Sequence, residues 1–299
     1  NGYREQLAWR RDIGLLDPAT SFEVVADPGG RRVGSLGATL NVLEKLRSKL
    51  SGKGGRDGAK NVFKGRRVLI CHSGGDSRRT PAYAAQGKVF TPVPAAAADG
   101  VPLALFDLIL QTLQEMPAPA GGHVLVTSGD VLLTFDHASV DLTRPGVSGV
   151  AYFGTAERGS RHGVYVPEAF TVSPLRTECV SVADFLQKPS VAEARQRGAE
   201  DPFGHVAVDT GLLSFDPDAC ARLLDASKQA GGSTAGGLTG ELERGLCPAL
   251  DLYEDLTMAL SPRIDKRAFS TLYVNGAERT ARTRGACGAS TGSCATYLS

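Results

Sequence analysis

Leucine recurs at near-helical spacing in the first part of the chain. Leu36, Leu40, Leu43, Leu46 and Leu50 repeat with a period close to 3.6 residues, so they fall on one face of a helix. The pattern therefore predicts an amphipathic helix that starts at about Leu36.

Short apolar runs that end in glycine indicate buried strands. Residues 68–71 form such a run before Gly74 and Gly75, and HVLVTSGDV at residues 123–131 repeats the pattern. Further strands are expected at 149–153, 163–166 and 205–215, and helices near 103–113, 190–197, 216–229 and 250–260. This alternation favours an α/β fold with a mostly parallel sheet between helices, in which ligands bind beyond the carboxyl ends of the strands.

Composition and charge narrow the class of protein. The chain has 299 residues, of which 42% are hydrophobic, and its 33 basic and 32 acidic residues give a net charge of +1. Such a balance argues against a general nucleic-acid binder, which needs clustered positive charge. Pro, Gly or a charge breaks each apolar run, and the start NGYREQLAWRRD lacks a secretory core, so we expect no membrane span and a cytoplasmic location. The six cysteines are scattered singly, which favours reduced thiols over a zinc site.

Turn-forming residues divide the chain. The stretch SGKGGRDGAK at residues 51–60 is typical of a surface loop, and the end of the chain is rich in small and polar residues without periodicity. We therefore expect an N-terminal segment, a main domain and a poorly ordered tail, with bounds 1–60, 61–275 and 276–299.

A glycine-rich loop with three cations follows the strand at 68–71. It is neither a Walker A loop, since Val89 follows Lys88, nor a GxGxxG dinucleotide fingerprint. Glycines let the backbone approach a phosphate and cations neutralise it, although a tight turn with solvated arginines is the alternative. The candidate nucleotide-binding residues of this loop are Gly74, Gly75, Ser77, Arg78, Arg79 and Lys88.

The loop GGDSRRTPAYAAQGKVFTPVP resembles the GGxGTRLxP…PK…PV signature of sugar-1-phosphate nucleotidyltransferases, with Asp76 and Ser77 in place of Gly and Thr. More narrowly, it is similar to the fucose-1-phosphate guanylyltransferase family, which includes bifunctional fucokinase/GDP-fucose pyrophosphorylases. The resemblance extends through SGDVLLTFD, HGVYV, VADFLQKP, VDTGLLSF and LDLYEDL. It implies a Rossmann-like, glycosyltransferase-A-like fold with a mixed, mostly parallel sheet flanked by helices.

The resemblance also implies catalytic roles for three residues. Arg79 would contact the triphosphate and help pyrophosphate to leave, and Lys88 would offset charge near the scissile bond. Asp130, at the end of a strand in SGDV, would hold Mg²⁺, since a hard cation prefers an oxygen ligand. A turn or N-cap role is the alternative for Asp130.

Four residues are implied on the sugar phosphate side. Lys188 in FLQKP matches the lysine of an FxEKP motif, although Gln187 replaces the glutamate. Asp209 and Gly211 in VDTGLL match the turn that lines the sugar pocket, where a carboxylate accepts hydrogen bonds from hydroxyls. Glu254 and its neighbour Asp255 are adjacent on an expected helix, so at most one of the two reaches the ligand.

The segment GSLGAT precedes and enters the first predicted helix. Its backbone N–H groups could face an anion or a base edge, which makes Gly34, Ser35 and Gly37 candidate nucleotide-binding residues. A plain helix N-terminus is the alternative, and Leu36 replaces a glycine that is usual in the family.

The implied reaction forms GDP-L-fucose and pyrophosphate from GTP and L-fucose 1-phosphate. An oxygen of the sugar phosphate attacks the α-phosphorus in line with departing pyrophosphate, with Mg²⁺ as cofactor. A fused or separate fucokinase is the implied partner. The alternatives are another hexose 1-phosphate or nucleotide, or a non-catalytic nucleotide-binding module that regulates a sugar kinase.

Overall fold

The computed structural model describes residues 2–51, 61–73, 81–83, 87–170, 177, 179–230, 237–263 and 293–298. These residues form two compact units. The first unit comprises residues 1–26, 71–116 and 127–138, and the second comprises 27–70, 117–126 and 139–299. Among the described residues, none of the helices combines the length and the apolar character needed to cross a membrane.

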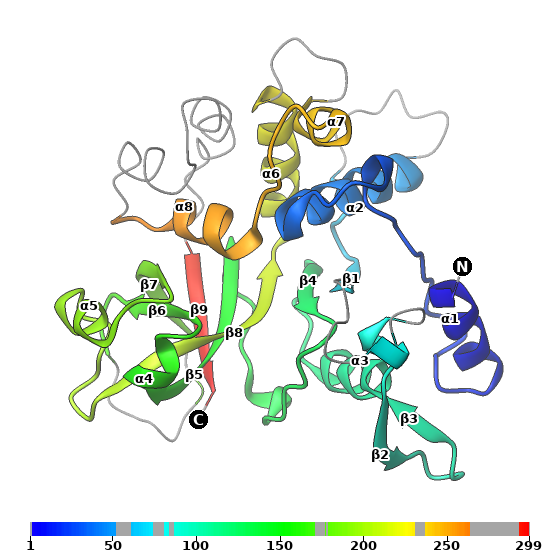
Figure 1. Cartoon of the computed structure of the whole chain (residues 1–299), viewed down its shortest axis with the longest axis horizontal. Helices are drawn as coiled ribbons and strands as arrows, with labels where there is room; N and C mark the ends of the chain where they lie inside the picture. Colours follow the sequence, from blue (N-terminus) through cyan, green and yellow to red (C-terminus); the bar gives the residue numbers. More distant parts are fainter. Residues whose placement is uncertain are drawn as a thin grey trace. The chain divides into compact units, whose positions relative to one another are not determined.

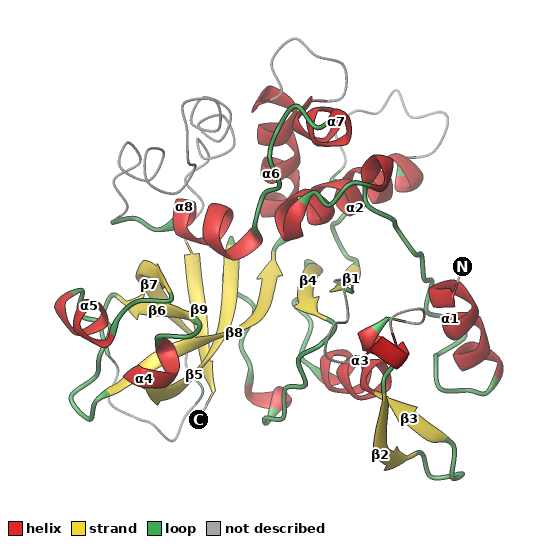
Figure 2. Cartoon of the chain, in the orientation of Figure 1, coloured by secondary structure: helices red, strands yellow, loops and turns green. Residues whose placement is uncertain are grey.

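A seven-stranded sheet organises the fold, in the order β1-β4-β8-β5-β9-β7-β6. Figure 2 shows β5, β8 and β9 next to one another in this sheet. All but one of the six residues of β4 are buried, as in a strand that is covered on both faces. The strands of this sheet are β1 (Arg67–His72), β4 (His123–Ser128), β5 (Val147–Thr155), β6 (Gly163–Pro167), β7 (Cys179–Gln187), β8 (His205–Phe215) and β9 (Ser293–Leu298).

The mixed α/β sheet expected from the sequence is confirmed. The expectation of mostly parallel strands fails in the half that surrounds β8, because β8 runs antiparallel to β4, β5 and β6. Strand β9 runs parallel to β5 and antiparallel to β7. It lies within the C-terminal range 276–299 for which composition predicts little order, and residues 264–292 lie outside the described part.

Helices α2 (Gly34–Leu50), α6 (Pro217–Ala230) and α7 (Gly237–Arg244) build the largest core of the second unit with the sheet (Figure 1). Leu40 and Leu43 of α2 pack in this core with Val124 of β4 and Leu213 of β8. The leucine period that predicts α2 therefore faces the sheet, as the burial of apolar surface requires. The shorter elements of this unit are η1 (Pro28–Gly30), α4 (Ala156–Gly159), α5 (Val191–Gln196), η5 (Leu252–Thr257) and α8 (Met258–Leu260).

The first unit has its own core. Leu7 of α1 (Gly2–Asp12) packs with Val89 and Phe90 of the 3-10 turn η3 (Lys88–Phe90), and Phe106 of α3 (Leu105–Glu115) joins them. The hairpin of β2 (Pro92–Ala96) and β3 (Pro102–Ala104) connects η3 to α3. Two further 3-10 turns are η2 (Pro81–Tyr83) and η4 (His137–Ser139).

The cysteines depart in part from the expectation of reduced thiols. Cys71, Cys220 and Cys247 are free, whereas Cys179 is in a disulfide. The expectation is therefore wrong for Cys179, because the sequence distance between two cysteines does not reveal whether the fold brings them together.

Candidate active site

The ends of β1 and β4 meet in the first unit. The N–H of Gly129 donates to the carbonyl oxygen of His72 at 2.7 Å, and a Cβ atom on Gly129 would lie 2.8 Å from that oxygen. The close approach leaves no room for a side chain at residue 129. It directs the chain into a turn that presents Asp130 directly after β4.

Asp130 and Lys88 form an ion pair in this place, and we call Lys88, Ser128 and Asp130 the phosphate-side cluster. The Lys88 Nζ atom lies 3.7 Å from the Asp130 Oδ2 atom, and the side chains are 33% and 52% exposed. The hydroxyl of Ser128 donates to Oδ1 of Asp130. Val89 and Phe90 are buried directly after Lys88, so the lysine stands on an anchored turn while its ammonium group stays accessible to a ligand.

Cys71 is the thiol nearest in sequence to this turn. Burial, and to a smaller extent the carboxylate of Asp130, raises the pKa of Cys71 to about 12. The thiol therefore stays protonated at neutral pH, which excludes it as a nucleophile, because the thiolate is the reactive form.

The chemistry of Asp130 fits a magnesium ion. In proteins Mg²⁺ is commonly held by one or two carboxylates together with substrate phosphates and water. Among the described residues there is no group of three or more His, Cys, Asp or Glu side chains that could hold a metal. Asp130 would supply one oxygen ligand to such an ion.

The remaining candidates of the glycine-rich loop cannot be placed. Residues 74–80 lie outside the described part of the chain, and these include Gly74, Gly75, Ser77, Arg78 and Arg79. Of the proposed catalytic residues, the structure thus brings together Lys88 and Asp130.

In the second unit, Asp209 lies beside a bulge of β8. The register between β5 and β8 shifts where Val150 pairs with Leu212 and Ala151 pairs with Asp209. The extra residues of β8 include Gly211, which adopts a φ of 78° that favours glycine. Bulges of this kind commonly redirect side chains next to active sites.

Tyr165 and Gly211 fix the carboxylate of Asp209. The hydroxyl of Tyr165 donates to Oδ1 at 3.1 Å, and the N–H of Gly211 donates to the same oxygen at 3.0 Å. Burial raises the pKa of Asp209 to about 6, while the two donors oppose that shift because they stabilise the charged form. A desolvated carboxylate of this kind is well suited to accept hydrogen bonds from hydroxyl groups.

A π-helical turn, η5, carries Tyr253 and Glu254 next to this bulge. The hydroxyl of Tyr253 donates to the carbonyl oxygen of Gly211 at 2.9 Å. Asp255 is buried and its Oδ2 atom accepts from the N–H of Asp251 at 2.6 Å, whereas Glu254 is exposed. Of the two adjacent carboxylates, Glu254 is therefore the one available to a ligand, because Asp255 caps the turn from within.

Lys188 directly follows β7. Its side chain is exposed, its backbone φ is 49°, and its N–H donates to the carbonyl oxygen of His162 at 2.9 Å. Gln187 pairs with Gly163 across β6 and β7, and a Cβ atom on Gly163 would lie 3.2 Å from the Cβ of Asp209. The β7 end thus lies across β6 from the Asp209 bulge, and we call Lys188, Asp209, Gly211, Tyr253 and Glu254 the sugar-side cluster.

Gly34, Ser35 and Gly37 make structural contacts at the start of α2. A Cβ atom on Gly34 would lie 2.1 Å from the carbonyl oxygen of Leu250, and one on Gly37 would lie 3.1 Å from Leu242. The hydroxyl of Ser35 donates to Asp251 at 3.0 Å and accepts from the N–H of Leu252 at 2.7 Å. These contacts explain why glycine and serine occupy the three positions, with no need to invoke a ligand. A nucleotide-binding role for Gly34, Ser35 and Gly37 stays a prediction.

Sequence reasoning missed Ser128 and Tyr253 as members of the two clusters, and it missed Tyr165 as a donor to Asp209. For Tyr253 the sequence holds a signal, because an aspartate such as Asp251 is a preferred N-cap and indicates that a helical turn begins there. In the structure the Asp251 carboxylate accepts from the N–H groups of Tyr253 and Glu254. For Tyr165 the alternation in HGVYV marks a strand but does not reveal the partner of its hydroxyl.

The fold and the two clusters define an α/β protein that presents a cation beside a carboxylate at the end of one strand and a half-buried carboxylate beside a bulge. The chain belongs to the fucose pyrophosphorylase family, because the family model described as the fucose pyrophosphorylase domain matches residues 60–283.

Curated relatives agree with this membership. The chain is 32% identical to a bifunctional fucokinase/GDP-fucose pyrophosphorylase of Arabidopsis thaliana, over 87% of the chain and 26% of that protein. It is 30% identical to a human fucose-1-phosphate guanylyltransferase, over 66% of the chain and 31% of that protein. The chain therefore spans between a quarter and a third of the length of these two relatives.

A solved structure entitled mannose-1-phosphate geranyltransferase, from Thermus thermophilus, is also similar to the chain. It is 17% identical with a TM-score of 0.32, and the similarity covers 71% of this chain and 59% of that chain. A likeness at this level adds no argument about function.

Proposed function

We propose that the chain transfers a guanylyl group from GTP to L-fucose 1-phosphate, which forms GDP-L-fucose and pyrophosphate. The observation that carries the proposal is the match of the fucose pyrophosphorylase domain across residues 60–283. An oxygen of the sugar phosphate would form a bond to the α-phosphorus while the bond to the pyrophosphate group breaks, so no covalent enzyme intermediate is required.

The phosphate-side cluster would act on the triphosphate. Lys88 and Asp130 form an ion pair with 3.7 Å between Nζ and Oδ2. In the complex, Lys88 would turn to the phosphates, where it offsets the charge that moves to the leaving pyrophosphate. Asp130 would hold Mg²⁺, which when bound screens the phosphates and stabilises the leaving group. Arg79 belongs to the same proposal as a second cation on the triphosphate.

The sugar-side cluster would orient the other substrate. Lys188 would neutralise the sugar phosphate, and Asp209 would accept hydrogen bonds from sugar hydroxyls. Among the described residues, the buried Oε1 atom of Gln187, the residue before Lys188, has no hydrogen-bond partner, so it would be a further acceptor on the sugar side. Positioning two polyanions in this way lowers the entropic part of the barrier.

A source of fucose 1-phosphate is the partner that this reaction needs. A fucokinase, fused to this domain or separate from it, would supply that substrate, and the Arabidopsis relative carries both names in one chain. A cytoplasmic location belongs to the same proposal, since the substrate is a nucleoside triphosphate.

Pyrophosphate release by the purified chain tests the proposal. GTP, ATP and UTP are each combined with fucose 1-phosphate, mannose 1-phosphate and glucose 1-phosphate, with Mg²⁺ and with chelator, and Asp130→Asn serves as the matched control. Release confined to GTP with fucose 1-phosphate is the expected result. Release with another pair would overturn the substrate, and nucleotide binding without release from any pair would indicate a regulatory module.

A further inference from the structure

Helix α1 contacts both ends of the glycine-rich segment from within the first unit. The hydroxyl of Tyr3 shares a hydrogen bond of 3.0 Å with the hydroxyl of Ser73, which is the last described residue before residues 74–80. The ring of Tyr3 meets the ring of Phe90 edge-on with centroids 5.7 Å apart. One side chain thus links the end of β1 to the turn that carries Lys88.

The backbone before Lys88 is shaped to receive this tyrosine. A Cβ atom on Gly87 would lie 2.0 Å from the Tyr3 hydroxyl oxygen, and the φ of Gly87 is 80°. A side chain at residue 87 would therefore displace Tyr3 as well as strain the backbone. The N–H of Gly87 donates to the carbonyl oxygen of Tyr83 at 2.9 Å, so the backbone that Tyr3 contacts is itself held by a hydrogen bond.

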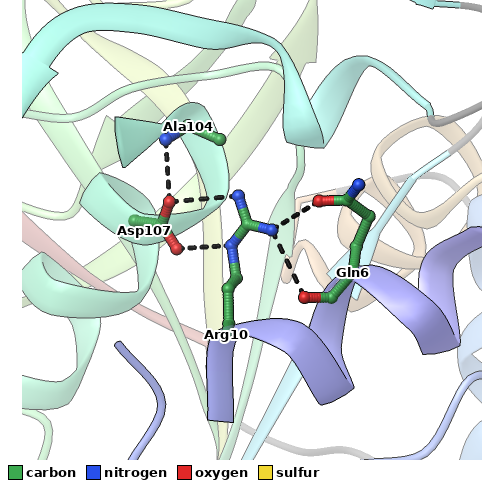
Figure 3. Close-up of polar contacts among 4 residues, drawn as sticks. All are labelled: Gln6, Arg10, Ala104 and Asp107. Atoms are coloured by element: carbon green, nitrogen blue, oxygen red, sulfur yellow. Dashed lines mark hydrogen bonds and ion pairs between the residues drawn. The ribbon is translucent and has the colours of Figure 1, made fainter. Parts of the chain in front are cut away.

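A buried ion pair fixes the position of α1 against α3 (Figure 3). The guanidinium of Arg10 donates to the two carboxylate oxygens of Asp107 at 2.6 and 3.2 Å, and to the side chain of Gln6 at 2.6 Å. Its central carbon also lies 4.7 Å from the centroid of the Phe90 ring. Arg10 therefore binds α1 to α3 through its ion pair, and it also packs on Phe90, which anchors the turn that carries Lys88.

We propose that Tyr3 is a positioning residue that sets Lys88 relative to the end of β1, with Arg10 as the anchor of its helix. Residues 2–12 lie outside the range 60–283 that the family model matches, so this role would add the N-terminal helix to the residues that act on the nucleotide. The expected effect of Tyr3 on turnover rests on the proposed function. Its effect on the position of the turn that carries Lys88 does not.

Amide hydrogen exchange tests the structural part without any substrate. In Tyr3→Phe the ring stays and the bond to Ser73 is lost, so we expect exchange about threefold to tenfold faster at the amides of Gly87, Phe90 and Thr91. Amides of β8 should stay unchanged, as should every amide in Glu5→Gln, a variant of an exposed residue on the same helix. Unchanged exchange at residues 87–91, or an equal rise in β8, would overturn the inference.

Turnover tests whether the effect passes through Lys88. Tyr3→Phe should lower kcat/KM for the nucleotide by roughly threefold to tenfold, and it should have little further effect in a Lys88→Met background, as coupled residues do. An equal loss in both backgrounds would refute a positioning role. A wild-type chain without turnover would refute the proposed function alone, and the exchange measurement would still decide the role of Tyr3.

Discussion

The hydroxyl of Tyr253 donates to the carbonyl oxygen of Gly211 at 2.9 Å and so ties the π-helical turn η5 to the bulge of β8, 42 residues away. The same bulge presents Asp209, whose carboxylate accepts from Gly211 and Tyr165. The geometry of the sugar-side cluster therefore depends on a residue from another element.

Replacement of Tyr253 by phenylalanine tests this dependence. We expect the KM for the sugar 1-phosphate to rise by about threefold to tenfold, which is the effect of one lost hydrogen bond, while the KM for GTP stays the same. Steady-state pyrophosphate release measures both constants. Tyr152→Phe is the matched control, since the ring of Tyr152 on β5 packs against Arg158 of α4. Equal rises in both KM values would refute a local role for Tyr253.

Removal of the carboxylate of Asp130 should affect turnover and the response to metal together. We expect Asp130→Asn to lower kcat by on the order of 10²-fold, the scale for one lost electrostatic partner, and to raise the Mg²⁺ concentration at half-maximal rate. A titration of MgCl₂ at saturating substrates measures both effects. Ser128→Ala removes the donor to Asp130 while the carboxylate remains, so its effect should be smaller. Wild-type kinetics in Asp130→Asn would remove this residue from the mechanism.

The raised pKa of Asp209 predicts a dependence of stability on pH. This pKa is about 6 in the folded chain, whereas its ordinary value is 3.8. Between pH 3.8 and about pH 6 the carboxyl group of Asp209 therefore binds more protons in the folded state than in the unfolded state. The contribution of Asp209 to the free energy of unfolding therefore falls as pH rises from about 4 to about 6. Thermal unfolding of the unchanged chain and of Asp209→Asn can be measured across this pH range. The contribution that falls with rising pH should be present in the unchanged chain and absent in Asp209→Asn.

Asp141→Asn is a control for that measurement, because the pKa of Asp141 is shifted in the opposite direction from that of Asp209. Hydrogen bonds from Thr143 lower the pKa of the exposed Asp141, so its contribution is present above its ordinary pKa of 3.8 and is lost as pH falls. Asp141→Asn should therefore keep the loss of stability between pH 4 and 6. If the stability of Asp209→Asn depended on pH in the same way as that of the unchanged chain, the raised pKa of Asp209 would not be the cause of the fall.

The buried pair of Arg10 and Asp107 should be costly to break. Arg10→Met leaves the carboxylate of Asp107 buried without its main partner, so we expect the free energy of unfolding to fall by about 3 to 5 kcal/mol. Urea unfolding measures the change, and Arg4→Met, an exposed position of the same helix, should shift it by less than about 0.5 kcal/mol. A loss below about 1 kcal/mol would show that water reaches Asp107.

Regular periods in the sequence determined most elements of the second unit. The strand expected at 205–215 is β8, and the leucines from Leu36 lie on α2, because alternation and the 3.6-residue period record which side of a segment faces the core. Asp130 was likewise visible because it follows an apolar strand, whereas Asp209 was singled out by the family resemblance of VDTGLL. The roles of these residues in catalysis stay predictions.

Only the tertiary structure decided how these elements are joined and which polar side chains meet. Helix α1 escaped the pattern analysis because one of its buried positions is Arg10, whose partner Asp107 lies 97 residues away. The sequence left Glu254 and Asp255 equivalent, and the bond from the Asp251 N–H to Asp255 separates them. Hydrophobic periodicity is local and fixes secondary structure, whereas charges and hydroxyls find partners through packing of distant segments, which no local pattern records.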